Sequence, residues 1–328
     1  MKTNQLYLGD NLSVMRRRLQ NESVDLVYLD PPFNSKKDYY LIFADGKARR
    51  SRTRVKAFED TWHWNRDAAR ALRYLTGTAA GAGKVPPNVS RLVSAIHQAI
   101  GGNDVMAYVV MMTERLLELH RVLKPTGSIY LHCDPAASHY LKIIMDAIFG
   151  ARNFRREIVW RSGWVSGFKA AARNWVRNHD ILLYYLKDHR AAWTFNKPTA
   201  FLPHAPAYKR RGGGENPKGV AIDDVWTDIF SPWIMSYSGE KLGWPTQKPL
   251  ALLKRIIEIS TNKGDLVLDP FCGCGTTIVV AEELGRGWIG IDISPVALAV
   301  TKDRLRKNQP GEPVGRTRGQ NHPAEPGS

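Results

Sequence analysis

Asp25-Leu26-Val27-Tyr28-Leu29-Asp30-Pro31-Pro32-Phe33 is the stretch on which the fold of this chain depends. Leu26 to Leu29 form a continuous apolar run, which is the pattern of a strand buried on both faces in a parallel sheet. Asp30-Pro31-Pro32 ends that run abruptly. The Asp30 carboxylate is therefore expected at the carboxyl end of a strand, where open α/β sheets have their ligand crevices.

The residues after this strand suit a planar ligand. Two prolines fix φ and lack an N–H, so the loop is stiff and the carbonyls of Asp30 and Pro31 lack local partners. Phe33 adds a flat apolar ring. Together these groups could hold a planar base by its amino group. Taken alone, however, Asp-Pro-Pro favours the simpler interpretation that it only ends a strand.

A similar design returns near the other end of the sequence. Asp265-Leu266-Val267-Leu268-Asp269-Pro270-Phe271-Cys272-Gly273-Cys274-Gly275-Thr276-Thr277 predicts a buried strand, an Asp-Pro stop and a glycine turn. The turn should open a helix from about Thr276 to Leu284. Gly273 and Gly275 allow the backbone to approach a ligand closely, and the helix N-terminus offers N–H groups.

Asp292 ends the next apolar strand, Trp288 to Ile291. It follows Asp269 by 23 residues (292 − 269). That spacing is close to the roughly 20 residues typical of an acidic residue that binds ribose hydroxyls. A dinucleotide fingerprint would need a third glycine where the chain has Ile278. We therefore favour a nucleoside ligand without a pyrophosphate over NAD.

Three motifs, taken in order, resemble those of S-adenosylmethionine-dependent DNA amino-methyltransferases. They are Asp30-Pro31-Pro32-Phe33, Thr246-Gln247-Lys248-Pro249 and Asp269-Pro270-Phe271-x-Gly273-x-Gly275-Thr276. A catalytic motif that precedes the cofactor motif is the order of the family's β class. The resemblance covers roughly residues 1–34, 106–160 and 240–305. It implies an α/β fold with a Rossmann-like methyltransferase sheet, a circularly permuted motif order and an inserted target-recognition region.

The resemblance also implies roles for individual residues. The catalytic set is Asp30, Pro31, Pro32 and Phe33, in which Phe33 stacks on the base while Asp30 and the Pro31 carbonyl hold its amino group. The cofactor-binding set is Asp10, Thr246, Lys248, Asp269, Pro270, Phe271, Gly273, Gly275, Thr276 and Asp292. Asp10 would contact the adenine amino group of the cofactor S-adenosylmethionine, and Thr246 and Lys248 would lie near its carboxylate. From the residues alone, Asp10 is equally a helix cap, and the Thr246 motif is equally a simple helix start.

The composition favours a polyanionic partner, most simply nucleic acid. Lys plus Arg number 47 against 31 Asp plus Glu, which gives a formal net charge of +16. The three cysteines, Cys133, Cys272 and Cys274, make neither a disulfide framework nor a zinc pattern, so we expect no metal and a reducing compartment. No apolar run has the length of a membrane span, and we expect a soluble cytoplasmic protein.

The chain is expected to divide into two halves of one domain with an insertion between them. Residues 1–160 form the catalytic half, with a flexible insertion at about 76–104, and residues 241–307 form the cofactor-binding half. Residues 161–240 resemble a target-recognition region with one strand, His179 to Leu186. Residues 308–328 are predicted to be a disordered tail.

Two polar residues follow the predicted strand Ser128 to Cys133 or lie near its end. We interpret His132 and Asp134 first as polar residues at a sheet end and second as substrate contacts.

The expected activity is that of a site-specific DNA adenine-N6 methyltransferase. The enzyme would flip its target base out of the duplex and transfer the methyl group directly. Aspartate rather than serine at position 30 leans towards adenine in this family. Cytosine-N4 methylation, an RNA substrate and a DNA-binding module without catalysis remain alternatives. The implied partner is double-stranded DNA. A homodimer and a cognate restriction endonuclease, as in a restriction-modification system, stay open.

Overall fold

The structure is a computed structural model. It describes residues 2–32, 62–78, 85–163, 173–197, 221–232, 240–244 and 246–307, together with the backbone of strand residues 37–44, 52–60, 201–202 and 220. Phe33, the predicted tail 308–328 and parts of the predicted recognition region lie outside these residues. No described helix is both long enough and apolar enough to cross a membrane.

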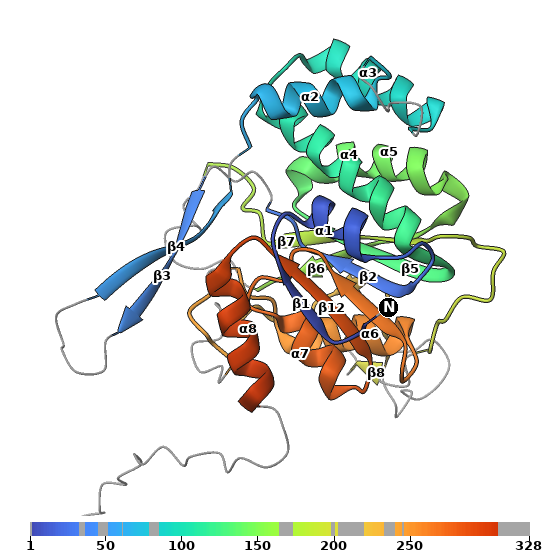
Figure 1. The fold of residues 1–328 in the computed structure, drawn as a ribbon. Coiled ribbons are helices and arrows are strands. Elements are labelled where there is room, and N and C mark those ends of the chain that lie inside the picture. Colours follow the sequence, from blue (N-terminus) through green and yellow to red (C-terminus); the bar gives the residue numbers. More distant parts are fainter. Residues whose placement is uncertain are drawn as a thin grey trace, which may run out of the picture.

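An eight-stranded sheet forms the centre of the protein (Figure 1). Its order is β1 (Gln5–Leu8), β12 (Gly287–Asp292), β11 (Leu266–Asp269), β2 (Val24–Leu29), β5 (Leu123–Cys133), β7 (His179–Leu186), β6 (Phe154–Arg161) and β10 (Val225–Trp226). Neighbouring strands are parallel, except that β7 runs antiparallel to both β5 and β6.

The sheet brings the two ends of the sequence together. β2 pairs with β11, with Leu26 opposite Val267 and Val27 opposite Leu268. From this pair the chain continues outward in both directions, from β2 to β5 and from β11 to β12. Strand order therefore reverses between β2 and β11, which is the place where open α/β sheets bind ligands. Both Asp-Pro turns follow these two strands, as the permuted Rossmann-like topology requires.

Helices cover both faces of the sheet (Figure 1). One face carries α1 (Asn11–Arg18), α4 (Asp104–Val122) and α5 (Pro135–Phe149), and α2 (Arg66–Leu75) and α3 (Pro87–Ile100) lie outside them. The opposite face carries α6 (Leu250–Ser260) and α7 (Thr276–Glu283). α8 (Pro295–Lys307) packs beside α7, and a short 3₁₀ turn, η2 (Ala151–Asn153), links α5 to β6.

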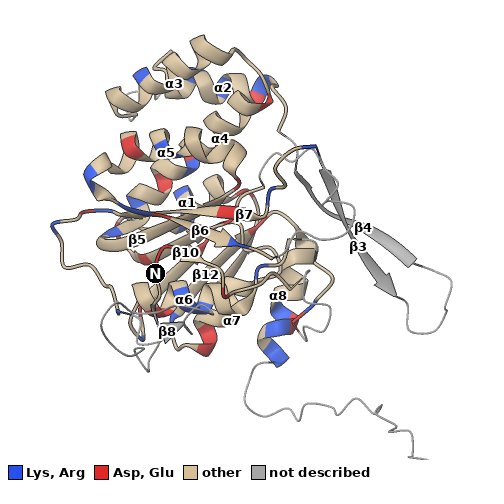
Figure 2. Cartoon of the chain, turned by 180° about the vertical axis from the view of Figure 1, so that it is seen from behind, with Lys and Arg blue, Asp and Glu red and all other residues tan. Residues whose placement is uncertain are grey.

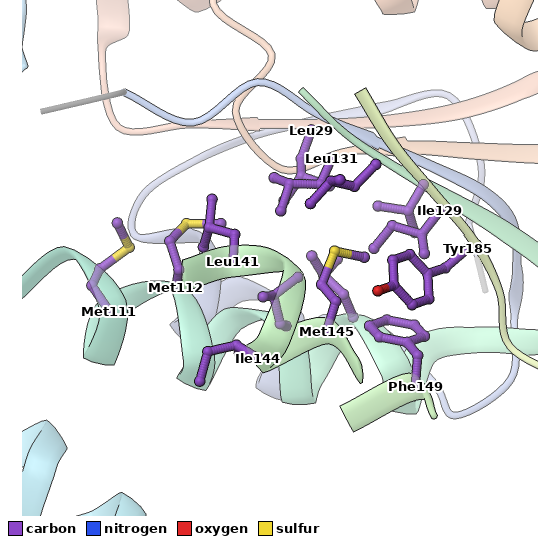
Figure 3. Close-up of a cluster of buried hydrophobic side chains, with 14 of the residues drawn as sticks. Leu29, Met111, Met112, Ile129, Leu131, Leu141, Ile144, Met145, Phe149 and Tyr185 are labelled. Carbon is purple, nitrogen blue, oxygen red and sulfur yellow. The ribbon is translucent and has the colours of Figure 1, made fainter. Parts of the chain in front are cut away.

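The apolar run of β2 supplies both layers of the core. Val27 and Leu29 point into the cluster below α4 and α5, whereas Leu26 and Tyr28 point into the cluster below α6 and α7. Figure 3 shows the first cluster, in which Leu29 and Leu131 face methionine and isoleucine side chains of α4 and α5. Because successive strand side chains alternate faces, a strand between two helical layers must be apolar throughout.

Most predicted elements are confirmed. His179–Leu186 and Leu250–Ser260 have the predicted bounds. The predicted helix from Thr276 ends at Glu283, one residue early. The predicted strand Trp288 to Ile291 is one residue longer at each end.

The predicted flexible insertion at about 76–104 is wrong over most of its described length. Residues 87–100 form the helix α3, whose Val89, Val93 and Ile96 are buried. Their spacing of three and four residues places them on one helical face, and Pro87 occupies the first turn, where proline is tolerated. The glycine- and alanine-rich composition just before it concealed this pattern.

The predicted boundary at residue 161 also needs correction. β7 lies inside the main sheet between β5 and β6, and β10 extends the same sheet beyond β6. Residues 179–186 are therefore part of the central domain rather than of a separate recognition region. Two small antiparallel pairs lie outside the main sheet: β3 (Lys37–Ala44) with β4 (Arg52–Asp60), and β8 (Phe201–Leu202) with β9 (Val220–Ala221).

Candidate active site

A cavity of about 680 Å³ opens at the carboxyl ends of β1, β2, β11 and β12. Apart from Gly275, every described residue that we predicted for the site lines it. These residues are Asp10, Asp30, Pro31, Pro32, Thr246, Lys248, Asp269, Pro270, Phe271, Gly273, Thr276 and Asp292. The structure thus brings together three motifs that are more than 200 residues apart in sequence at their extremes. The cavity is within the size range of sites for small molecules and cofactors.

The glycine turn after β11 has a conformation that side chains resist. Gly273 and Gly275 have φ values of +49° and +76°. A Cβ on Gly275 would lie 2.3 Å from Cγ2 of Thr301, so this position has no room for a side chain. Although Gly275 does not line the cavity, it caps α7 and directs the first turn of that helix towards it.

Asp269 organises this turn from beneath. Its Oδ1 accepts a hydrogen bond from the Phe271 N–H at 3.0 Å, and its Oδ2 accepts one from the Thr277 hydroxyl at 2.6 Å. Burial raises the pKa of Asp269 to about 7, against the lowering effect of these two hydrogen bonds. With both oxygens engaged inside the protein, Asp269 stabilises this turn more than it offers a contact to a ligand.

Asp292 joins the glycine turn to the end of β12. Its Oδ2 accepts a hydrogen bond from the Gly273 N–H and its Oδ1 one from the Ser294 N–H, both at 2.8 Å. Burial raises the pKa of Asp292, and the backbone donors oppose that rise. A carboxylate oxygen has further lone pairs, so Asp292 can also accept hydrogen bonds from a hydroxyl-bearing ligand.

Asp10 takes the helix-capping role that we considered for it. Its Oδ1 accepts a hydrogen bond from the Ser13 N–H at 2.9 Å, at the start of α1. Its Oδ2 accepts one from Arg115 of α4 at 2.6 Å. Arg115 also donates to the Asn11 side chain at 2.6 Å, and Asn11 in turn donates to the Pro270 carbonyl at 2.8 Å.

Arg115 was not among the predicted site residues. The available signal was an arginine in a largely apolar helix, and it was weak because the same helix also contains Arg121. Burial lowers the pKa of this guanidinium, and the neighbouring Asp10 carboxylate counteracts the effect.

Asp30 directly follows β2, and one of its carboxylate oxygens is paired while the other is not. Its Oδ2 accepts a hydrogen bond from the Lys248 ammonium, and the two side chains are only 16% and 12% exposed. Its Oδ1 is buried and has no hydrogen-bond partner among the residues that the structure describes. A buried acceptor without a partner costs free energy, so this oxygen is suited to a donor on a ligand.

A chain of polar groups runs from the cavity floor to its rim. The Tyr28 hydroxyl lies 2.9 Å from Nδ1 of His132, and Nε2 of the same ring lies 3.3 Å from Oδ2 of Asp180. Arg177 donates to Asp180 at 3.2 Å and to Asp134 at 2.9 Å. Asp134 also caps α5. Tyr28, Asp134 and Arg177 line the cavity, whereas His132 is fully buried.

These hydrogen bonds bear on the roles that we predicted for His132 and Asp134 at the end of β5. His132 has the structural role that we ranked first, because both ring nitrogens contact neighbouring side chains. Asp134 lines the cavity as well as capping a helix. The contribution of Arg177 and Asp180 could not be read from sequence, since β7 had been assigned to another region.

The described residues contain no group of His, Cys, Asp or Glu side chains arranged to hold a metal ion. Cys133, Cys272 and Cys274 are buried free cysteines. Burial raises the pKa of each thiol, so all three are held in the protonated form.

Comparison with known proteins gives consistent matches. The model of the N6/N4 methyltransferase family, described as DNA methylase, matches residues 24–303. The Type II methyltransferase M.BamHI of Bacillus amyloliquefaciens is 29% identical over 313 residues, which cover 92% of this chain and 56% of that protein. The DNA adenine methyltransferase YhdJ of Escherichia coli K12 is 32% identical over 203 residues, which cover 60% of this chain and 67% of that protein.

A solved structure supports the fold. The PvuII DNA methyltransferase, described as cytosine-N4-specific, superposes with a TM-score of 0.58 at 17% identity, covering 95% of this chain and 89% of that one. The chain spans less than two thirds of the first curated relatives that it matches.

Proposed function

Because the chain belongs to the N6/N4 DNA methylase family, we propose that it methylates the exocyclic N6 amino group of adenine in duplex DNA, with S-adenosylmethionine as methyl donor. The observation that carries the proposal is the largely buried Asp30 carboxylate. Its buried Oδ1 has no partner in the described part of the chain, and Asp30 lines a cavity together with the glycine turn and Asp292. That combination offers one acceptor for an amino group and a separate corner for a nucleoside.

The residues of the cavity fit S-adenosylmethionine. Asp292 would accept hydrogen bonds from the ribose hydroxyls, and the turn at Gly273 admits close approach of the backbone. Thr246 and Lys248 would supply a hydroxyl and an ammonium to bind the carboxylate of the cofactor's amino-acid end. When bound, the cofactor supplies a methyl group activated on a sulfonium.

Asp30 and Pro31 have the role of activating the target amino group. The lone pair of an exocyclic amino group is delocalised into the ring, so the group is a poor nucleophile. Asp30 Oδ1 and the Pro31 carbonyl would accept hydrogen bonds from its two N–H groups and favour a tetrahedral nitrogen, which frees the lone pair for in-line attack. The carboxylate would also stabilise the positive charge that develops on the nitrogen. Phe33 would stack on the base.

This arrangement requires the target base to leave the duplex. Asp30 and Pro31 line a cavity at the ends of the strands, which a stacked and paired base cannot enter. The net charge of +16 favours a phosphate-rich partner. Lys and Arg are spread over several described elements, including the end of α8 (Figure 2), so the charge supports nucleic-acid binding without marking one interface.

Two facts favour adenine as the target base. Position 30 is aspartate, which leans towards adenine in this family, and the relative YhdJ is described as a DNA adenine methyltransferase. Cytosine-N4 methylation would use the same acceptors, so the product must be identified chemically.

The test is incubation of the purified protein with mixed-sequence duplex DNA and methyl-labelled S-adenosylmethionine, followed by nucleoside analysis by mass spectrometry. We expect N6-methyladenine, and sequencing of the modified sites gives the recognition sequence. The Asp30→Asn variant keeps the shape but loses the charge, and should lower the rate at least about 100-fold. Label on N4-methylcytosine would change the base assignment. No label on the DNA, with cofactor binding shown independently, would overturn the proposal.

A further inference from the structure

The Lys248 ammonium lies beside Asp30 and within electrostatic reach of the glycine turn. On one side it donates to Asp30 Oδ2. Its charge also reaches Asp180 on β7 and Cys274 in the glycine turn. Burial alone would raise the pKa of Asp180, but His132, Lys248 and Arg177 together hold it below its usual value. Burial raises the pKa of Cys274, and the charges of Arg304 and Lys248 partly offset that rise.

The backbone that carries Lys248 is firmly held. The buried Gln247 side chain donates to the Glu240 carbonyl at 2.6 Å and accepts from the Leu242 N–H at 3.0 Å. The Glu240 carboxylate accepts from the Leu250 N–H at 3.1 Å, at the start of α6. A fixed backbone with a flexible four-carbon side chain allows the ammonium to change partners while its attachment stays in place.

The contact with Asp30 conflicts with the chemistry that we assign to that carboxylate. The target amino group needs Asp30 as its acceptor and becomes positively charged as the methyl group is transferred. An ammonium held on the same carboxylate would repel that charge and compete for the acceptor. For the reaction to proceed with full stabilisation from Asp30, the ammonium must acquire a different anionic partner.

We infer that Lys248 is shared between Asp30 and the carboxylate of the cofactor's amino-acid end, so that cofactor binding withdraws the ammonium from Asp30 and prepares this residue for the target base. The inference rests on the proposed function, since it takes the cofactor site from there. Lys248 is then a positioning residue that couples the two substrates, in addition to being a cofactor contact.

Coupling of this kind is reciprocal and can be measured without DNA. If Asp30 competes with the cofactor for Lys248, removing the Asp30 charge should strengthen binding of a ligand that carries the carboxylate. S-adenosylhomocysteine carries it. 5′-Methylthioadenosine has the same nucleoside and sulfur but lacks the amino-acid group, so its binding should not depend on Lys248.

The experiment is titration calorimetry of both ligands with the wild type, Asp30→Asn, Lys248→Met and the double variant. Asp30→Asn should bind S-adenosylhomocysteine about five- to tenfold more tightly, the lower range of typical coupling. Lys248→Met should bind it more weakly, and adding Asp30→Asn to that variant should have no further effect. All four proteins should bind 5′-methylthioadenosine alike within about twofold, which also shows that each is folded.

A matched control and two contrary results complete the design. Lys254→Met removes a half-exposed lysine of α6 that pairs with Glu283 outside the cavity, and it should leave both affinities unchanged. If Asp30→Asn does not strengthen S-adenosylhomocysteine binding, the inference is wrong. It is also wrong if the gain persists in the Lys248→Met background, because Asp30 would then repel the ligand directly. If the wild type binds neither ligand, the proposed function is wrong, and the inference about Lys248 is wrong with it.

Discussion

The Arg115 guanidinium donates to the Asp10 carboxylate at 2.6 Å, although 105 residues separate them in sequence. The same side chain holds Asn11, which in turn reaches the Pro270 carbonyl. One arginine of α4 thereby ties the end of β1 to the Asp-Pro turn after β11. Helix α4 packs on the sheet face opposite α6 and α7, yet its Arg115 helps to fix the turns that line the cavity.

Arg115→Met is therefore expected to weaken cofactor binding. Methionine keeps much of the apolar stem but leaves Asp10 and Asn11 without their shared donor, at a cost of about 1–3 kcal/mol for the unpaired groups. We expect S-adenosylhomocysteine affinity to fall roughly tenfold or more, in line with that cost. Calorimetry measures it. Arg70→Met, which removes an exposed pair with Asp67 on α2, is the control. Equal affinities for the two variants would contradict the role of Arg115.

A second prediction concerns the close approach at the glycine turn. Gly275→Ala combines a φ of +76° with a Cβ placed 2.3 Å from Thr301, whereas Gly285→Ala has a φ of +71° with no atom within 4 Å. Gly285→Ala should cost only the backbone strain, about 1–2 kcal/mol. Gly275→Ala should lower the free energy of unfolding by clearly more, because α8 must also move.

Denaturant unfolding of the two variants compares these costs. Adding Thr301→Ala to Gly275→Ala should recover part of the difference, since it removes the hydroxyl and methyl that the new Cβ meets. If both glycine variants lose the same stability, the contact with Thr301 is unimportant and only φ matters.

How far the sequence predicted this site depended on whether the signal was local. Asp30 and Asp269 were found because an apolar run followed by Asp-Pro marks a strand end within a few residues. The segment of α6 was predicted to the residue because its helical spacing and Pro249 are also local. Arg115, Arg177 and Asp180 were missed, since each acts through partners brought near only by the sheet.

The misplaced strand has the same cause. His179–Leu186 was correctly predicted as a strand, but nothing within eight residues tells whether a strand joins the main sheet or a separate unit. Its pairing with β5 and β6 is decided by residues 18 to 58 positions away. The resemblance located the motifs. The folded structure was needed to show which other residues, such as Arg115, contact and hold them.

Asp269 gives a prediction for the dependence of stability on pH. Its pKa is about 7 in the folded protein, above the ordinary value of 3.8, because the carboxyl is buried. The folded state therefore keeps a proton that the unfolded state has already released. The stability linked to this group is fully present below about pH 4 and is lost as the pH rises through 7.

Asp269→Asn should remove this part of the pH dependence. An asparagine oxygen can still accept from the Phe271 N–H, and its amide can donate to the Thr277 hydroxyl. The difference in unfolding free energy between variant and wild type should thus shift in favour of the variant between pH 5 and pH 8. Chemical unfolding at several pH values measures it. A constant difference across this range would show that Asp269 does not titrate there.

The last prediction separates the nucleoside end of the site from its amino-acid end. Asp292→Asn should weaken binding of both S-adenosylhomocysteine and 5′-methylthioadenosine, about tenfold or more, because both ligands carry the ribose that this carboxylate would hold. Lys248→Met should weaken only the first. The Asp292 oxygens also accept from the Gly273 and Ser294 N–H groups, so thermal unfolding must show that the variant is folded. Unchanged dissociation constants in a folded Asp292→Asn protein would remove this residue from the site, and a loss confined to S-adenosylhomocysteine would place the ribose elsewhere.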